Sequence, residues 1–597
     1  MGNKVEQLLS AWCETLLWLQ VSGTGHDRLD GAILCPACGR VHGRCGDAMY
    51  PFLHMAKETG DAKWIDAAKG LFFWMDRVVG LPNGRLLNDI DSSWEGITVF
   101  FVEQLALCLK NYETLLDDVT VAQWRGRLRS ATDSLVDYEE LNVDNINYSI
   151  GCALALVTSA GVIGDERYET AARSYIEAVY PYFLEDGLLA GEGEPRSAIT
   201  AYGCRPVDIG YNVEESLPML LRYGLLAHDG RAIDLARRSM RAHLDFLLPD
   251  GGWDNSFGTR KFKWTYWGSR TTDGAISALL ELSERPDDEF ALAAKLQLDL
   301  LASCTHDGLL CGGPHYVAAG QPVCVHHTFE HAKMLAEVLD GGLDRKLYHR
   351  KVAHGTAVQR LPRLARQGFR SYPELRTWVG SFGEATATVT AYDFEYLPGG
   401  HTSGGSISLL SHASHGPLLC ASVGEYVRRE RNNMQVPYRV QHECLTLRVE
   451  RRQDGAVFSS MYEDAPRVAV DGGVVEVSGY LKDVYHVPCV DAPQAYRMRY
   501  VFTPESLELV AELPHAATLV VPLISEQDER VTQKVGENHV PVLRIDKATG
   551  SIALVVKTGE LSLPYGEERI FNLVPGLQAL RIDVAPCEGR VCLSLSW

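Results

Sequence analysis

A short turn built around Asp-Gly recurs through the first half of the chain, and this repeat limits the fold more than any other feature. Its six copies are centred on Asp30, Asn83, Asp144, Asp186, Asp250 and Asp307. A helical pattern such as GDAKWIDAAKG or GDERYETAARS precedes most copies, and a polar loop and a more apolar helix follow each one. Self-similarity at a spacing of 42 to 64 residues indicates stacked helical hairpins.

Six hairpins can close into a ring, with apolar helices inside and amphipathic helices outside. We therefore predict an N-terminal (α/α)6 toroid over residues 1–350 as the catalytic domain, with an open helical solenoid as the alternative. In a ring, the loops that follow the turns gather at one end and line one cavity, where a binding site is expected. Two of these loops, 187–211 and 251–269, are long and should narrow that cavity to a pocket or short tunnel.

The sequence period changes after about residue 355. Short β-branched and aromatic runs such as CLTLRVERR and SLELVAEL are separated by turn residues and indicate strands. We predict an antiparallel β-sandwich domain at 379–597, so the fold class is α+β multidomain. An Arg-rich linker at 351–378 should join the two domains and pack on acidic neighbours.

Composition restricts the partners and the location. The 597 residues carry a formal net charge of −20, which argues against a general nucleic-acid binder. We expect no apolar run to reach the length of a membrane span, and MGNKVEQLLSAW lacks the pattern of a signal peptide. We expect a cytoplasmic protein with reduced thiols, unless a leader has been removed. The oligomeric state is left open.

The stretch GGWDNSFGTRKFKWTYWGSRTTDG at 251–274 combines six aromatic residues with four cations. Indole rings stack on sugar rings, and the planar guanidinium of Arg matches a carboxylate with two hydrogen bonds. An acidic sugar is the simplest ligand that would use both kinds of side chain. The alternative is that some of these aromatic residues only brace the interior of the ring.

Several segments resemble one known family: CPACGRVHGRCGDAMYPF, DIGYNVEESLP, the 251–274 stretch, HDGLLCGGPHYV, CVHHTFEHAK and SYPELRTWVGSFGEATATVTAYDFEYLPGGHTSGGSISLL. That family is the polysaccharide lyases that remove L-rhamnose caps from D-glucuronate in arabinogalactan side chains; the layout is more distantly similar to heparinase II/III-type lyases. The resemblance implies β-elimination at a 4-linked uronate, giving free rhamnose and a 4,5-unsaturated glucuronate. The implied partner is an acidic oligosaccharide or polysaccharide, and no cofactor is expected. With a narrowed pocket, we predict exo attack.

Such a lyase removes the C5 proton of a uronate and expels the group at O4. It needs donors that neutralise the carboxylate, a base for the proton and an acid for the leaving oxygen. In a glucuronate the C5 hydrogen and O4 leave from the same side, so one residue or two adjacent ones can serve both steps. The catalytic candidates lie in the loops: Tyr211, Tyr266, Arg260, Arg270, His327 and His331.

Among these candidates, Arg260 and Arg270 are the predicted carboxylate clamp, and Tyr211 or Tyr266 is the predicted base and acid. His326, His327 and His331 open the last inner helix and offer another base. For each one, a structural hydrogen-bonding role is the alternative. The substrate-binding candidates are His42, Arg44, Trp94, Asn147, Glu214, Trp253, Asn255, Trp267, His315, Tyr316 and His401.

The first of these loops also has a metal-like spacing. Cys35, Cys38, His42 and Cys45 form C-x2-C-x3-H-x2-C, and three thiolates with an imidazole can hold zinc tetrahedrally. The spacing matches no common zinc finger. We therefore expect no metal and keep this set as the alternative.

Two other functions stay open. An inverting glycoside hydrolase needs two carboxyl groups, and the loops contain enough acids to supply them. A noncatalytic glycan-binding protein needs aromatic rings and arginines alone, and the many His and Tyr residues count against it. Of the three, a lyase alone creates the conjugated, ultraviolet-absorbing unsaturated uronate.

Overall fold

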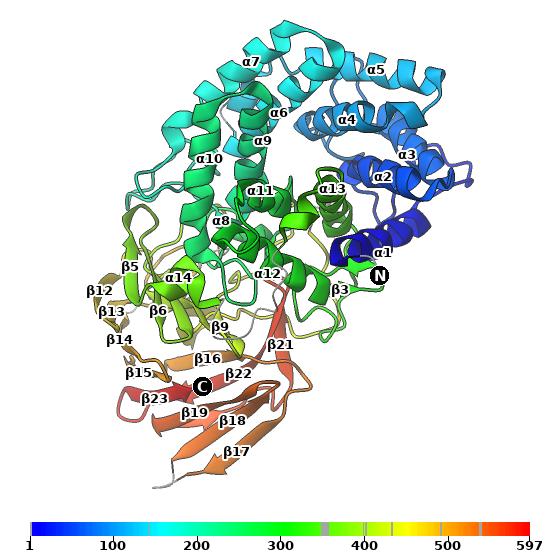
Figure 1. The fold of residues 1–597 in the computed structure, drawn as a ribbon. Coiled ribbons are helices and arrows are strands. Elements are labelled where there is room, and N and C mark those ends of the chain that lie inside the picture. The colour runs from blue at the N-terminus through cyan, green and yellow to red at the C-terminus, as the bar shows by residue number, and fades with distance from the viewer. Residues whose placement is uncertain are drawn as a thin grey trace.

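Helices fill the first half of the chain and antiparallel strands the second, as Figure 1 shows. The computed structural model describes residues 3–142, 144–347, 358–397, 399, 403–430, 434–489, 492–536 and 540–597. In Figure 1 the helices occupy the upper part of the molecule and strands β16 to β23 the lower part. The predicted order, a helical region followed by a β-rich region, is confirmed.

Six helices contact one another in cyclic order. They are α2 (Met49–Thr59), α4 (Thr98–Tyr112), α6 (Ile146–Ile163), α9 (Leu217–Ala227), α11 (Ala275–Leu282) and α13 (His326–Asp340). Each contacts the next, and α13 contacts α2 again. Their hairpin partners are, in the same order, α3 (Lys63–Trp74), α5 (Asp118–Asp133), α7 (Glu166–Glu177), α10 (Gly230–His243), α12 (Glu289–Ser303) and α1 (Lys4–Leu19). A closed ring requires this cyclic order of contacts. An open solenoid would lack the contact between its last and first inner helices, here α13 and α2.

The recurring turns bring each hairpin close to a neighbouring outer helix. Five of them carry a glycine with positive φ: Gly31, Gly84, Gly187, Gly251 and Gly308. At Gly251, with φ at 93°, a Cβ atom would lie 2.3 Å from the carbonyl oxygen of Leu296 in α12. At Gly308 it would lie 2.0 Å from Oγ1 of Thr15 in α1. Glycine alone permits both the conformation and the approach, and the contact with α1 joins the last turn to the first helix.

Aspartates cap the start of four of the outer helices, and one of them, Asp165, lies in the GDERYETAARS pattern described above. The side chains of Asp117, Asp165, Asp229 and Asp288 accept hydrogen bonds from backbone N–H groups in the first turns of α5, α7, α10 and α12. Each such cap stabilises its helix by about 1 kcal/mol. GDERYETAARS therefore marks a capped helix N-terminus, whereas in GDAKWIDAAKG helix α3 begins after Ala62 without a side-chain cap.

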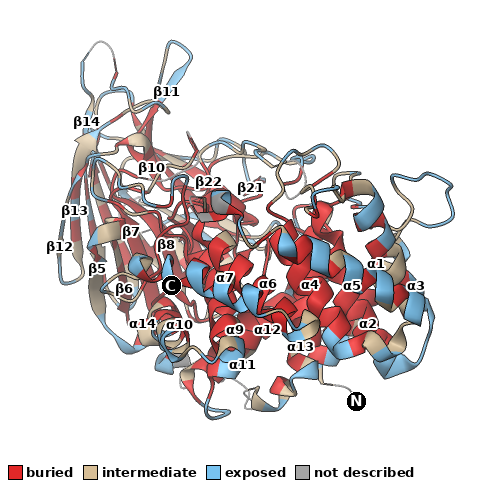
Figure 2. Ribbon diagram, turned by 90° about the horizontal axis from the view of Figure 1, so that it is seen from above, coloured by how far each residue is buried: buried red, intermediate tan, exposed pale blue. Residues whose placement is uncertain are grey.

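The inner helices are more deeply buried than the outer ones, as α4 and α6 show beside α5 and α7 in Figure 2. Helix α6 packs against α4, α7 and α9 and is therefore apolar all round. Among the described residues it is the one helix whose length and composition would allow a membrane span, and 78% of that window is buried in the protein. The expectation that no run reaches this length does not hold for α6, whose burial is that of a core helix.

The β region contains three larger antiparallel sheets. The first has five strands: β5 (Gly368–Tyr372), β6 (Thr377–Phe382), β7 (Ala385–Thr390), β8 (Ser406–His412) and β9 (Gly416–Cys420). The second has eight, in the order β12 (Arg467–Asp471), β13 (Val474–Tyr480), β14 (Ala495–Phe502), β15 (Ser506–Glu512), β23 (Arg590–Ser596), β19 (Gly550–Thr558), β18 (Pro541–Lys547) and β17 (Val531–Val535). The third comprises β11 (Ala456–Ser459), β10 (Arg448–Gln453), β16 (Thr518–Ile524), β22 (Leu577–Ala585), β20 (Glu560–Ser562) and β21 (Arg569–Asn572).

The five-stranded sheet is covered on both faces. On β8, Leu409 belongs to the apolar core of the helical region, while the next residue, Leu410, belongs to the core shared by the three sheets. Successive residues of a strand point to opposite faces, so this sheet separates the two cores. It therefore fixes the β region against the helices.

The Arg-rich segment before β6 packs on acidic residues of the helical region, as the sequence predicted. Arg363 Nη1 lies 2.7 Å from Asp254 Oδ2. Arg366 and Arg370 both pair with Asp245, at 3.0 and 2.6 Å. Strand β5 lies inside the range that we predicted as linker, and the domain limits stay predictions.

Candidate active site

A cavity of about 600 Å³ lies among the loops that follow the turns. The first loop contributes Arg44, the start of α6 contributes Asn147, and the short helix α8 (Ile209–Tyr211) contributes Tyr211. The β region closes one side with Tyr396 and the 429–430 segment. This volume is typical of a site for a ligand of a few sugar-sized units.

Tyr211 stands against two cations of the 251–274 stretch. Lys263 Nζ donates a hydrogen bond to Tyr211 Oη at 3.0 Å. The guanidinium carbon of Arg260 lies 3.9 Å from the centre of the Tyr211 ring. Burial raises the pKa of Tyr211 well above its ordinary value, and the charge of Arg260 partly opposes that rise. The phenol is therefore protonated at neutral pH and held beside positive charge.

Asp208 holds the backbone of Tyr211 and Arg260 in place. Its carboxylate accepts hydrogen bonds from the backbone N–H of Tyr211 at 2.9 Å and from that of Arg260 at 2.7 Å. Asn255 Nδ2 donates to the same carboxylate, and Asn255 Oδ1 accepts from the backbone N–H of Ile209. Asp208 and Asn255 thus tie α8 to the basic loop and act as positioning residues.

A π-helical turn at Asn212–Ser216 points two consecutive glutamates in different directions. Glu215 reaches the cavity, where Asn147 Nδ2 donates to its carboxylate at 2.7 Å. Glu214 points away from the cavity and accepts from Gln297 Nε2 at 3.0 Å. Burial and the neighbouring Asp273 raise the pKa of Glu215, and Arg44 opposes the rise. The cavity therefore holds a buried carboxyl group whose pKa lies above its ordinary value.

His326 opens α13 at the cavity. Its Nε2 lies 3.2 Å from Glu330 Oε1, but neither ring nitrogen makes a hydrogen bond with the described residues. Burial lowers the pKa of His326 well below its ordinary value, and the charges of neighbouring His and Arg residues add to this. The imidazole is therefore neutral at pH 7.

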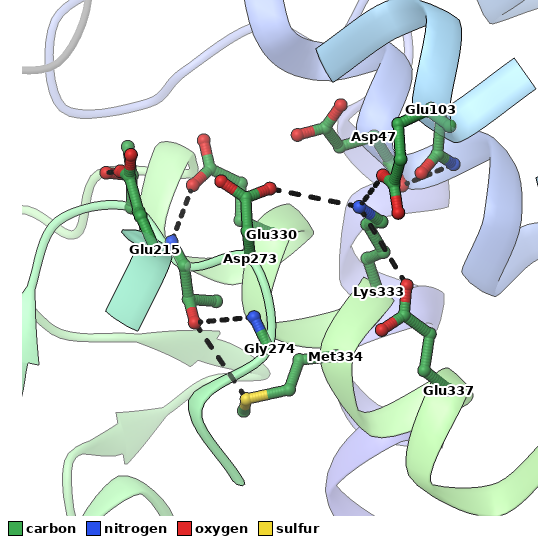
Figure 3. A network of polar contacts seen from close by, with 12 residues as sticks. Asp47, Glu103, Glu215, Asp273, Gly274, Glu330, Lys333, Met334 and Glu337 are labelled. Atoms are coloured by element: carbon green, nitrogen blue, oxygen red, sulfur yellow. Dashed lines mark hydrogen bonds and ion pairs between the residues drawn. The ribbon is translucent and has the colours of Figure 1, made fainter. Parts of the chain in front are cut away.

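Behind the cavity, Lys333 on α13 sits among several carboxylates, as Figure 3 shows. It pairs with Glu103 at short range and with Asp273 and Glu337 at 3.8 Å. Arg44 links this cluster to the cavity, because its guanidinium contacts both Asp47 and Asp273. We call Lys333, Glu103, Asp273 and Glu337 the Lys333 cluster.

Comparison with known proteins identifies the family of this chain. Residues 9–355 match the ulvan lyase N-terminal domain, and residues 369–596 match the ulvan lyase C-terminal domain. The chain belongs to the ulvan lyase family. A broad-specificity ulvan lyase of Formosa agariphila is 34% identical over 601 residues, covering 98% of this chain and 91% of that protein.

Two solved lyases share the fold. The chondroitin AC lyase of Streptomyces coelicolor A3 in complex with chondroitin sulphate superposes with a TM-score of 0.51 at 12% identity, covering 99% of this chain and 79% of that one. A Paenibacillus xanthan lyase gives a TM-score of 0.53 at 10% identity, with 100% and 58% covered. The predicted enzyme class, polysaccharide lyase, is confirmed. The family is that of ulvan lyases, and specificity for rhamnosyl-glucuronate stays a prediction.

Six of the residues singled out from the sequence line the cavity of this ulvan lyase family member. They are Tyr211, Arg260, Arg44, Trp94, Asn147 and His326. All six come from loops that follow the turns or from the helix starts behind those loops. Their individual roles stay predictions.

The other residues of the 251–274 stretch that were predicted for the site lie in the core instead. The hydroxyl of Tyr266 donates to Asp250 at 2.8 Å, and Arg270 is buried near Tyr316. The indole N–H of Trp267 donates to the carbonyl of Cys311. None of these side chains lines the cavity, because tertiary contacts hold them inside the ring. The same holds for the fully buried Trp253 and for Asn255 and Glu214 described above.

The other predicted residues also lie off the cavity. His327 and His331 pack their ring edges on Trp267, at centroid distances of 5.6 and 4.8 Å. His315 Nδ1 accepts from the backbone N–H of Gln578 in the β region. Tyr316 is buried next to it, His42 belongs to a thiol cluster, and His401 lies outside the described residues.

The predictions gave no role in the lyase reaction to three groups that face the cavity. Lys263 was noted as basic but given no role, although it lies in the stretch that drew attention. Glu215 is adjacent to Glu214, and the π-helical turn that exchanges their directions has no clear sequence signal. Glu430, whose Oε1 lies 2.6 Å from Lys263 Nζ, comes from an irregular segment of the β region. No periodicity marks such a segment.

Proposed function

We propose that this chain cleaves an acidic polysaccharide by β-elimination at a 4-linked uronate, and that its substrate is a rhamnose- and uronate-containing polymer of the ulvan type. Membership of the ulvan lyase family supports the substrate class, because ulvan contains rhamnose and glucuronate. The contact of Tyr211 with Lys263 and Arg260 at the cavity carries the proposal for the chemistry. We likewise assign the helical ring to the (α/α)6 toroids and the β region to the sandwich class.

Neutralising the uronate carboxylate is the first requirement of the reaction. The second N–H of the Asn147 amide, and the Glu215 carboxyl when it carries a proton, can donate hydrogen bonds to a carboxylate in the cavity. Arg44 adds positive charge beside them. Donors fixed before the substrate arrives stabilise the enediolate that forms when the C5 proton leaves.

The two proton transfers then fall to Tyr211 and His326. His326 is neutral and takes the C5 proton, while the electron pair of that bond forms the enediolate. The C4–O4 bond breaks as the C4–C5 double bond forms, and protonated Tyr211 gives its proton to O4. Lys263, which donates to the Tyr211 oxygen, stabilises the phenolate that remains. His326 and Tyr211 exchange protons with water before the next turnover.

Digestion of purified polysaccharides tests this proposal. We expect ulvan to yield ultraviolet-absorbing unsaturated uronates, with arabinogalactan and chondroitin sulphate cleaved at least tenfold more slowly. Chromatography of early products should show small terminal products and a barely shortened polymer, because the predicted mode is exo. Reducing ends without ultraviolet absorbance would identify a hydrolase, and binding without either product would identify a noncatalytic role.

A further inference from the structure

Three thiols and one imidazole meet where the helical ring closes. Cys35, Cys38 and His42 belong to the first loop, and their sulfur and nitrogen atoms all lie within 4.8 Å of one another. Cys324 comes from the other end of the ring, two residues before α13. Its sulfur lies 3.7 Å from Cys35 Sγ and 3.6 Å from His42 Nε2.

Three of the distances between these ligand atoms fit a tetrahedral metal. Zinc binds thiolate at about 2.3 Å and imidazole nitrogen at about 2.0–2.1 Å, which places neighbouring ligands about 3.8 Å apart for S–S pairs and about 3.6 Å for S–N pairs. The Cys35–Cys324, Cys38–His42 and Cys324–His42 distances are 3.7, 3.7 and 3.6 Å. Thiols that merely pack together have no reason to adopt these three distances at once.

We propose that Cys35, Cys38, His42 and Cys324 bind one structural zinc ion. Three thiolates and an imidazole are a ligand set that favours zinc, and four protein ligands leave no position for substrate. The site is therefore structural and independent of the proposed reaction. Neither Cys45, which the sequence spacing suggested as the fourth ligand, nor Cys324 is within 4.8 Å of all three clustered atoms. The Cys324 sulfur, however, lies within 3.7 Å of two of them, so we take Cys324 as the fourth ligand.

The ion would tie the two ends of the ring together. Its ligands join the loop before α2 to the segment before α13, and α2 and α13 are the inner helices whose contact closes the cycle. The His42 ring lies 5.0 Å from the ring of His326, which lines the cavity. Fixing His42 on a metal would therefore also fix the surface on which His326 packs.

Metal analysis of the full chain, purified without a histidine tag, tests the proposal. We expect about one zinc ion per chain in the wild type. Cys324→Ser should lose at least nine-tenths of it, whereas Cys45→Ser, a matched buried thiol in the same loop, should keep it. Cys38→Ser, which alters the least buried ligand, serves as the second variant if Cys324→Ser does not fold.

Cobalt substitution gives a second readout. Replacing zinc with Co²⁺ should produce the intense visible bands of a tetrahedral thiolate site in the wild type and in Cys45→Ser, and weaker, shifted bands in Cys38→Ser. Three outcomes would overturn the proposal: a wild type that neither contains nor takes up zinc, equal metal loss in Cys45→Ser, or an intact mass that shows a Cys35–Cys324 disulfide.

Discussion

Arg260 and Lys263 at the cavity and Lys333 behind it are all buried cations, but they are neutralised in different ways. Lys333 contacts three carboxylates, which shield it from every ligand. Arg260 pairs with Glu192 and Lys263 pairs with Glu430. Both cavity cations also contact Tyr211, whose ring faces an open volume.

Buried charge is therefore a poor marker of catalysis by itself. Burial of an ion is costly, so a buried cation needs partners whether it serves structure or chemistry. The difference lies in where the remaining contacts point. In the Lys333 cluster they point to more protein, and at the cavity they point to a phenol that a substrate can reach. Variants at the cavity should therefore change activity, and variants of the Lys333 cluster should change stability.

The largest effect should come from the phenol at the cavity. Tyr211→Phe removes the proton donor but keeps the ring, so kcat should fall by about 10²–10⁴-fold. His326→Asn should cause a loss of similar size by removing the base. The melting temperature of each variant should stay within a few degrees of the wild type, as checked by circular dichroism.

A substrate with a different leaving group distinguishes the two roles. A synthetic uronate with fluoride at C4 needs no acid, so Tyr211→Phe should cleave it at nearly the wild-type rate. His326→Asn should stay inactive, because the C5 proton must still be removed. If both variants cleave it normally, neither residue takes the C5 proton. If Tyr211→Phe stays inactive, Tyr211 is the base.

The next effect is on stability and belongs to the region behind the cavity. Lys333→Met removes the cation that Glu103 shares with Arg222 and leaves Arg222 alone to neutralise both Glu103 and Glu337. Breaking a buried ion pair costs about 3–5 kcal/mol, and Arg222 should keep the loss toward the lower end of that range. Lys69→Met is the matched control, since Lys69 pairs with Asp117 at the surface and its loss should cost about 0–1 kcal/mol. Denaturant unfolding measures both. Equal effects would show that the Lys333 cluster adds no stability.

The sequence could predict the ring and part of the cavity because both follow from local patterns. The Gly251 and Gly308 turns and the aspartate caps are local signals, and Tyr211 and Arg260 lie in loops whose position follows from the repeat. The sequence could not show that Tyr266 lies in the core while Tyr211 lies at the cavity. That difference depends on the contact of Tyr266 with Asp250 and not on residue type. Nor could the sequence pair Lys263 with Glu430 or His42 with Cys324, which meet only in the folded chain.

The smallest effect should come from Glu214, which shares the π-helical turn with Glu215 but points into the protein. Burial raises the pKa of Glu214 from 4.5 to about 8, so the folded state holds its proton more tightly than the unfolded state does. The contribution of protonated Glu214 to the free energy of unfolding is fully present below pH 4.5. It falls as the pH rises to about 8. Glu214→Gln cannot ionise, so its melting temperature should decline less over that range. Burial also raises the pKa of Glu192 to about 7. The melting temperatures of the wild type and of Glu214→Gln should therefore both decline somewhat over this range. The exposed Glu177→Gln should follow the wild type, and a Glu214→Gln curve that also does so would show that Glu214 titrates as it does in the unfolded chain.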